Sequence, residues 1–167
     1  VFYYTVGFQF GLDREGGYDS DRGIEVLRKY AEGFGLGETS GLEIPETEPN
    51  ISDTDSVLSA IGQGTNNYTV SQLNRYVSTV ANKGTVYKLT LLDRTTDANG
   101  KIIKKYEPMV INEMKRVSNS TWDLVHNGMI AMINSTSSFS NMGGLQMAGK
   151  TGTAQQSDVH ADHALFV

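Results

Sequence analysis

The segment GGLQMAGKTGTAQQ, residues 143–156, constrains the fold of this chain more than any other stretch. Its letters fit two unrelated structures. Gly144, Gly149, Lys150 and Thr151 match the spacing G-x-x-x-x-G-K-T of a phosphate-binding loop, which joins a buried strand to a helix. The same residues also fit a β-strand that presents the Lys150 ammonium and threonine hydroxyls to a bound carboxylate. Because these structures belong to different folds, the flanking residues must decide between them.

The flanks of this segment favour the strand. A phosphate loop needs a strand before its first glycine and a helix after its threonine, because the helix N-terminus supplies donors to the phosphates. The preceding residues STSSFSNMG are polar and turn-like, and Gly152 and Thr153 are poor helix formers. Only 16 residues follow Thr151, too few for the rest of a nucleotide-binding domain. A phosphate-loop nucleotide-binding protein is therefore a remote alternative.

The β-branched threonines and the glycines predict a β-strand over residues 146–154, with residues 163–167 paired antiparallel beside it. A peptide can add to the edge of such a strand through main-chain hydrogen bonds. Taken alone, the four residues K-T-G-T are explained equally well by an ordinary hairpin strand without a ligand.

Hydrophobic residues at helical spacing predict several helices along the chain. Thr69 and Gln72 form a T-x-x-Q capping box, which marks the start of one of them, and Gly84 stops its apolar stripe. The predicted helices cover residues 1–10, 21–34, 70–81 and about 118–133.

The segments 85–93 and 101–107 are strand-like, with the turn pair Asn99-Gly100 between them. Residues 35–53, rich in glycine, proline and acids, predict an ordered loop; a flexible linker is the alternative. We expect the acidic residues 43–55 to be solvated. Helices and antiparallel strands in this order indicate an α+β fold.

Composition excludes several classes of protein. A hydrophobic content of 38% and a charged content of 20% are those of a soluble globular protein. The net charge of −5 comes without a basic run, so we expect no nucleic-acid partner. The longest apolar-rich stretch covers ten residues, which is too short to cross a bilayer. The absence of cysteine excludes disulfides, thiol catalysis and cysteine-zinc sites.

The segment DVHADH offers Asp158, His160, Asp162 and His163 as metal ligands. On a strand, however, residues three apart point to opposite faces, and no third ligand is evident nearby. We therefore expect a solvated loop here, with no metal and no cofactor.

The segment AGKTGTAQ resembles the third active-site motif of the class B penicillin-binding proteins, the peptidoglycan D,D-transpeptidases. FGLGETSGLEIPETE, residues 34–48, resembles that family's F-G-x-G-x-x-T-G-[IL]-x-[IL]-P-x-E segment. SAIGQGTNNYTVSQLNRYVSTVANKG, residues 59–84, resembles its I-G-Q-G segment and the helix that follows. HALFV resembles the strand after K-T-G. These blocks come in the family's order and cover most of the chain.

The resemblance implies the penicillin-binding transpeptidase or serine β-lactamase-like fold, present here as a partial domain. The family's nucleophile motif S-x-x-K and its second motif S-x-N do not occur in residues 1–167. In the family, the S-x-N asparagine falls immediately before a segment like VFYYTVGFQFG, residues 1–11 of this chain. The resemblance therefore implies that residues 1–167 are a partial transpeptidase domain, which begins after S-x-N and ends in the strand after K-T-G. Without the nucleophilic serine, this chain should be inactive alone.

The resemblance also assigns roles at K-T-G. The whole enzyme attacks the terminal D-Ala–D-Ala bond of a stem peptide through a serine acyl-enzyme, which β-lactams trap. Lys150 would hydrogen-bond the serine of the second motif and add positive potential. Thr151, Gly152 and Thr153 would line the substrate or β-lactam. The backbone N–H of Thr153 would form half of the oxyanion hole.

The partners implied by the resemblance are peptidoglycan stem peptides, β-lactam antibiotics and the cell-wall synthesis machinery. The parent would act outside the cell membrane, held by an N-terminal anchor beyond this chain, and would bear on cell shape and antibiotic resistance. The piece itself is expected to be soluble. A serine β-lactamase or a non-catalytic β-lactam sensor of the same fold are the alternatives.

Overall fold

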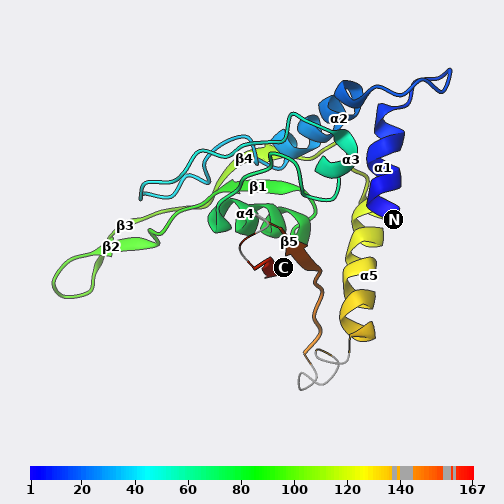
Figure 1. The fold of residues 1–167 in the computed structure, drawn as a ribbon. Coiled ribbons are helices and arrows are strands. Elements are labelled where there is room, and N and C mark those ends of the chain that lie inside the picture. The colour runs from blue at the N-terminus through cyan, green and yellow to red at the C-terminus, as the bar shows by residue number, and fades with distance from the viewer. Residues whose placement is uncertain (137–138, 140–144, 156–158, 160) are drawn as a thin grey trace. The chain divides into compact units, whose positions relative to one another are not determined.

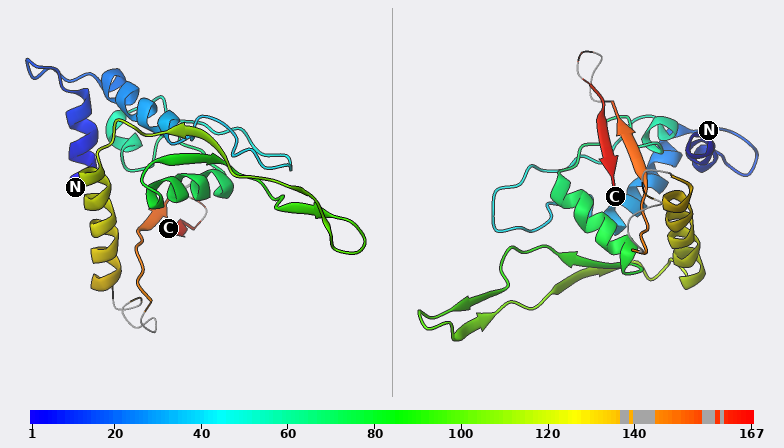
Figure 2. Two further views of the ribbon diagram at one scale, coloured as in Figure 1. Left: turned by 180° about the vertical axis from the view of Figure 1, so that it is seen from behind. Right: turned by 90° about the horizontal axis from the view of Figure 1, so that it is seen from below.

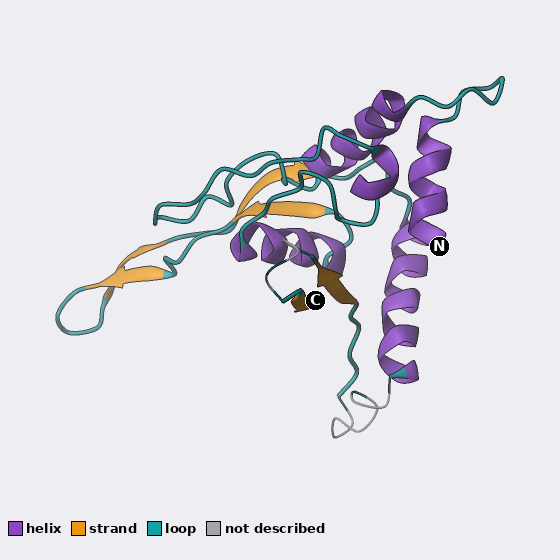
Figure 3. Ribbon diagram, viewed as in Figure 1, coloured by secondary structure: helices purple, strands orange, loops and turns teal. Residues whose placement is uncertain are grey.

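The chain divides into two units, Val1–Met114 and Lys115–Val167. The structure is a computed structural model that describes every residue except 137–138, 140–144, 156–158 and 160 (Figure 1). Each unit combines helices with antiparallel strands, coloured purple and orange in Figure 3. The expected α+β class is confirmed.

Three helices of the first unit pack against one another: α1 (Phe2–Gly11), α2 (Ser20–Gly33) and α3 (Ser56–Ser59). The helices predicted over 1–10 and 21–34 are confirmed. Helix α3 was not predicted, because four residues are too few to show a helical period. Its start is fixed by Asp55, whose carboxylate accepts hydrogen bonds from the N–H groups of Val57 and Leu58.

Ser56 holds these three helices together. It is fully buried, and its Oγ donates to the carbonyl of Gly7 in α1 over 3.0 Å. Its N–H donates to the hydroxyl of Ser20 in α2 over 2.9 Å. A Cβ at Gly7 would lie 2.5 Å from the Ser56 carbonyl oxygen, so only glycine allows this approach.

The rest of the first unit is built on helix α4 (Val70–Ala81), which lies beside strand β1 in Figure 1. The predicted capping box is confirmed: Thr69 Oγ1 accepts from the Gln72 N–H, and Gln72 Oε1 accepts from the Thr69 N–H. Val80 in α4 and Val86 in β1 are both buried. The strands of this unit are β1 (Thr85–Lys88), β2 (Arg94–Thr96), β3 (Ile102–Lys105) and β4 (Met109–Glu113).

The strand pairing differs in part from the prediction. The turn pair Asn99-Gly100 does join two antiparallel strands, β2 and β3. However, β1 pairs with β4, a strand that was not predicted, and residues 89–93 form no strand. The Leu89 N–H donates to the carbonyl of Ser40, and the Leu91 N–H donates to Glu43. The loop that precedes α3 thus supplies the acceptors for backbone N–H groups that would otherwise pair with a neighbouring strand.

The second unit contains α5 (Asn119–Ser135), β5 (Thr151–Ala154) and β6 (His163–Phe166). The predicted helix start is confirmed, with Ser118 as the cap that accepts from the Thr121 N–H. Strands β5 and β6 pair antiparallel as predicted, although β5 is shorter than the expected 146–154. Among the described residues, no helix combines the length and apolarity needed to cross a bilayer.

Candidate active site

The pairing of β5 with β6 determines where the backbone of K-T-G points. Lys150 and Val167 exchange both backbone hydrogen bonds, over 2.8 and 3.2 Å. In an antiparallel ladder, hydrogen-bonded and non-hydrogen-bonded pairs alternate. Gly152, opposite Leu165, therefore directs its N–H and C=O at β6, whereas Thr151 and Thr153 direct theirs at the opposite edge of β5. No strand in the described part of the chain pairs with this edge, here called the free edge.

The side chains of K-T-G add charge and hydroxyl groups at the free edge. Lys150, Thr151, Gly152 and Thr153 are all exposed. Because side chains alternate along a strand, the hydroxyls of Thr151 and Thr153 share one face and Lys150 lies on the other. Lys150 Nζ donates to the Thr151 carbonyl oxygen over 2.6 Å, which brings the ammonium to the free edge. An N–H donor, a cation and two hydroxyls at a strand edge suit an extended chain that bears a negative charge.

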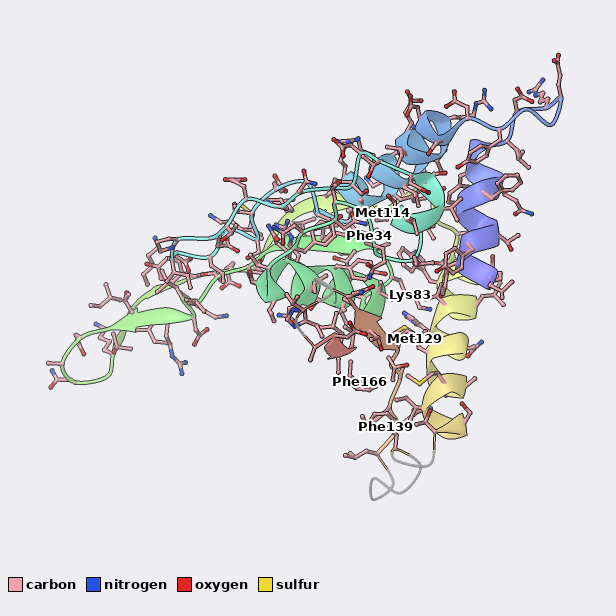
Figure 4. The ribbon with its side chains drawn as sticks, in the orientation of Figure 1. Phe34, Lys83, Met114, Met129, Phe139 and Phe166 are labelled. Carbon is pink, nitrogen blue, oxygen red and sulfur yellow. The ribbon has the colours of Figure 1, made fainter. Side chains whose placement is uncertain are left out.

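Gly149 attaches the base of this strand to the rest of the second unit. Its N–H donates to the Met129 carbonyl in α5 over 3.2 Å, which explains why regular strand pairing begins only after it. A Cβ at this position would lie 2.6 Å from Phe166 Cζ and 2.8 Å from the Val167 oxygen. The Phe166 ring in turn stacks on Phe139 with centroids 4.7 Å apart. Figure 4 labels Met129, Phe139 and Phe166 around this contact.

A phosphate loop does not fit this geometry. Its helix would have to begin after Lys150, where the structure has strand β5 instead. Gly144, the first glycine of the pattern, lies outside the described residues. Asp158 and His160, two of the ligands considered for a metal, also lie outside them. Within the part of the chain that the structure describes, no three His, Cys, Asp or Glu residues gather as metal ligands.

The first unit has a second cluster of polar contacts, around Glu46 in the loop that precedes α3. Its carboxylate accepts from the N–H groups of Ser40, Gly41 and Leu42 and from the hydroxyls of Ser40 and Ser71. Burial disfavours the charge, but the hydrogen bonds from Ser40, Ser71 and Gly41 lower the pKa of Glu46 to about 2.

The expectation that acids 43–55 are merely solvated is therefore wrong for several of them. Glu46 holds the loop, Glu43 accepts from the Thr90 hydroxyl and the Leu91 N–H, and Asp55 caps α3. Sequence reasoning missed these roles because each depends on backbone N–H groups, which nearly every residue has and which the residue types therefore do not reveal. Ser40 and Gly41, six and five residues before Glu46, were the available signal.

Arg75 in α4 binds the backbone carbonyls of the same loop. The residue is 2% exposed, and its guanidinium donates to the carbonyls of Gly35, Glu38 and Thr39. Gln72 adds a further hydrogen bond to the Glu38 carbonyl. Gly35 has φ +79, and a Cβ there would lie 3.0 Å from the guanidinium, so the position requires glycine. The loop is therefore ordered, as predicted, and not a linker.

Comparison with known proteins identifies this arrangement. The family model described as "Penicillin binding protein transpeptidase domain" matches residues 12–167. The chain belongs to this family. The K-T-G strand, the 34–48 loop and α4 all lie within the matched range, and the predicted membership of the class B penicillin-binding proteins is confirmed.

Similar proteins carry names from the same family. Penicillin-binding protein 2B of Streptococcus pneumoniae is 29% identical over 148 residues, which is 79% of this chain and 22% of that protein. Penicillin-binding protein H of Bacillus subtilis is 31% identical over 77% of this chain and 20% of that protein. The chain thus spans about a fifth of the length of these relatives.

Solved structures show the same fold. The crystal structure of PBPA from Mycobacterium tuberculosis matches 98% of this chain and 38% of its own with a TM-score of 0.76, at 21% identity. Penicillin-binding protein 2B from S. pneumoniae matches 78% of this chain and 24% of its own, with a TM-score of 0.67 at 25% identity. The penicillin-binding transpeptidase fold is therefore that of the present chain, as a partial domain.

Proposed function

We propose that residues 1–167 are the part of a D,D-transpeptidase domain that follows S-x-N and carries the K-T-G strand. The domain would cross-link peptidoglycan stem peptides through a serine acyl-enzyme, with the serine outside residues 1–167. Stem peptides and β-lactams would be its ligands and the cell-wall synthesis machinery its partner. The parent would work on the outer side of the cell membrane, held by an anchor beyond this chain.

The observation that carries the proposal is which residues of β5 direct their backbone N–H and C=O groups at β6 and which direct them away from it. The pairing leaves the Thr153 N–H unused by β6 and directed at the free edge, where half of an oxyanion hole is required. The hydroxyls of Thr151 and Thr153 share one face of the strand and are the candidates for contact with a substrate carboxylate, with Thr153 the stronger of the two. Gly152 has no side chain that would obstruct a peptide lying along the edge. Lys150 would leave the Thr151 carbonyl and turn to the serine of the second motif when that serine is present.

Removing the Thr153 N–H tests this proposal. Thr153→Pro deletes a donor that β6 does not use, so proline is tolerated at this edge. Thr153→Ala keeps the N–H and loses only the hydroxyl. In the full-length parent, labelled with a fluorescent penicillin, Thr153→Pro should slow acylation by about 10²- to 10³-fold, the usual effect of losing one oxyanion donor.

Thr151→Pro is the matched control, since it removes the neighbouring free-edge N–H at a similar cost in backbone freedom. It should slow acylation less than Thr153→Pro does. Equal effects of the two proline variants would contradict the assignment of Thr153. If the unmodified parent failed to label at all, the alternative of a non-catalytic domain would be favoured.

The 167-residue chain provides a separate test. It contains neither S-x-x-K nor S-x-N, so it should gain no penicilloyl mass in intact-protein mass spectrometry. A stoichiometric adduct on this chain would mean that one of its own serines is the nucleophile. If the parent were a serine β-lactamase, the other alternative, its acyl-enzyme would hydrolyse quickly and release the label. A transpeptidase should keep the label, because its penicilloyl-enzyme hydrolyses slowly. The names of the similar proteins favour the transpeptidase.

A further inference from the structure

The chain contains two Asn-Gly pairs in very different backbone settings, Asn99-Gly100 and Asn127-Gly128. Both asparagines are exposed, and a Cβ placed at either glycine would meet nothing within 4 Å. Side-chain crowding therefore does not distinguish the two pairs. What distinguishes them is the secondary structure that holds each backbone.

Asn99-Gly100 lies at the tip of the β2–β3 hairpin. The tip is held by three hydrogen bonds to Asp97: its carbonyl accepts from the Gly100 N–H over 3.0 Å, and its carboxylate accepts from the N–H groups of Asn99 and Lys101 over 2.9 Å each. Gly100 has φ +83, as such a turn requires.

The hairpin below this tip has little to stabilise it. Every residue of β2 and β3 is exposed, and the two strands pair only with each other among the described residues. In the views of Figures 1 and 2 it extends away from α4 and β1. A two-stranded hairpin with neither face covered is marginally stable in water, so the tip will open often.

Asn127-Gly128 lies at the middle of helix α5, which runs from Asn119 to Ser135. There the Gly128 N–H is engaged in the i→i−4 ladder, and helix ends fray long before the middle does. The asparagine side chain cannot approach that nitrogen unless several turns of helix are lost. The same dipeptide is thus held far more firmly here.

We propose that Asn99 is a site of spontaneous deamidation selected by this structure, and that Asn127 is protected. When the tip opens, the Gly100 backbone nitrogen gives up its proton and attacks the Asn99 side-chain carbonyl carbon. A C–N bond forms and ammonia leaves, which gives a five-membered succinimide. Water then opens the ring at either carbonyl to give aspartate or isoaspartate, with no change of oxidation state.

The reaction would change the hairpin in two ways. Residues 94–105 carry four positive charges (Arg94, Lys101, Lys104 and Lys105) and one negative charge (Asp97), a net +3 that deamidation lowers to +2. Isoaspartate also lengthens the main chain by one methylene at a turn whose hydrogen bonds to Asp97 depend on residue spacing. The modified tip should therefore close less often than the original.

The test is incubation of the 167-residue chain at 37 °C and about pH 8, with samples digested by trypsin and read by mass spectrometry. Cleavage after Arg94 and Lys101 isolates Asn99 in the peptide 95–101, and fragmentation of peptide 117–150 reports on Asn127. In the native chain Asn99 should convert at least about tenfold faster than Asn127, because opening the hairpin needs less free energy than opening mid-helix. In concentrated urea the two rates should become similar.

A variant strengthens the test. Asp97→Ala removes the carboxylate that accepts two of the three hydrogen bonds at the tip, those from the N–H groups of Asn99 and Lys101. It should speed the reaction at Asn99 while leaving Asn127 unchanged. Asn99→Gln should abolish the mass change in peptide 95–101, since glutamine does not form the five-membered ring. Equal rates at Asn99 and Asn127 in the native chain would overturn the proposal, as would a rate at Asn99 that Asp97→Ala does not alter.

Discussion

Replacing Glu46 with glutamine keeps the shape of the side chain but removes its charge and one of its two acceptor oxygens. The carboxylate now accepts five hydrogen bonds, from three backbone N–H groups and two hydroxyls. Glutamine would turn an amide donor toward some of these donors. The loop that runs from Gly35 to Glu46 should therefore loosen at this end.

The magnitude follows from the pKa of Glu46, which lies at about 2 against an ordinary 4.5. At about 1.4 kcal/mol for each tenfold change in proton affinity, this shift corresponds to a net stabilisation of the charged form of at most roughly 3.4 kcal/mol, the hydrogen bonds less the opposing effect of burial. Glu46 is only half-buried, so solvent screening reduces this to about 1–2 kcal/mol. We expect Glu46→Gln to lower the free energy of unfolding by that amount near neutral pH.

The effect should depend on pH with a definite sign. Because folding lowers the pKa of Glu46, its contribution is complete above the unfolded value of 4.5 and is lost as pH falls from 4.5 toward about 2. The gap between the original chain and Glu46→Gln should stay constant from about pH 6 to 8 and close in acid. Urea denaturation followed by circular dichroism at several pH values measures it.

Local and control measurements sharpen the result. Hydrogen exchange at the Gly41 and Leu42 amides, which donate to Glu46, should speed up in the variant. Glu48→Gln removes an exposed acid from the same loop and should change neither quantity. The reasoning is refuted if Glu46→Gln and Glu48→Gln behave alike, or if the gap persists unchanged down to pH 2.

Three further predictions, two of them with a control variant, are tested by urea denaturation. Arg75→Met should lower the free energy of unfolding by about 3 kcal/mol or more, because removing the buried guanidinium leaves three loop carbonyls without their donor. Lys29→Met, on the exposed side of α2, should be nearly neutral. Thr69→Ala removes half of the capping box and should cost about 1 kcal/mol; no loss would mean that the cap is dispensable. Gly149→Val should cost about 1–3 kcal/mol by displacing Phe166, and Gly152→Ala, with 3.6 Å to Leu165 Cβ, should cost clearly less.

The sequence predicted the elements that carry their own signal. The start of helix α4 is predicted by Thr69 and Gln72, and the start of α5 by Ser118. Both are recognisable because a capping residue lies at a fixed distance from the apolar stripe of its helix. The Asn99-Gly100 turn is local in the same sense. Pairing partners are not local: nothing in residues 85–88 indicates that they bond to residues 109–113.

The Glu46 cluster shows a second limit. A carboxylate in a loop rich in glycine and acids resembles a solvated side chain, because solvation is the common case for such residues. Its actual partners are the main-chain N–H groups of residues 40–42, the Ser40 hydroxyl and the hydroxyl of Ser71, 25 residues away. Only the folded path of the loop reveals them.

The candidate site combines both situations. Composition indicated a strand at K-T-G, but it could not indicate which edge the Thr153 N–H faces, since a shift by one residue exchanges the backbone groups presented at the two edges. In the structure the register is fixed where Gly149 receives the Phe166 ring and Lys150 exchanges two hydrogen bonds with Val167. A bulkier residue at 149 would displace Phe166, the partner of Thr151. Gly149 thus helps to fix the direction of the Thr153 N–H, the proposed oxyanion donor. It does so by setting the register between β5 and β6 and not by contacting a substrate.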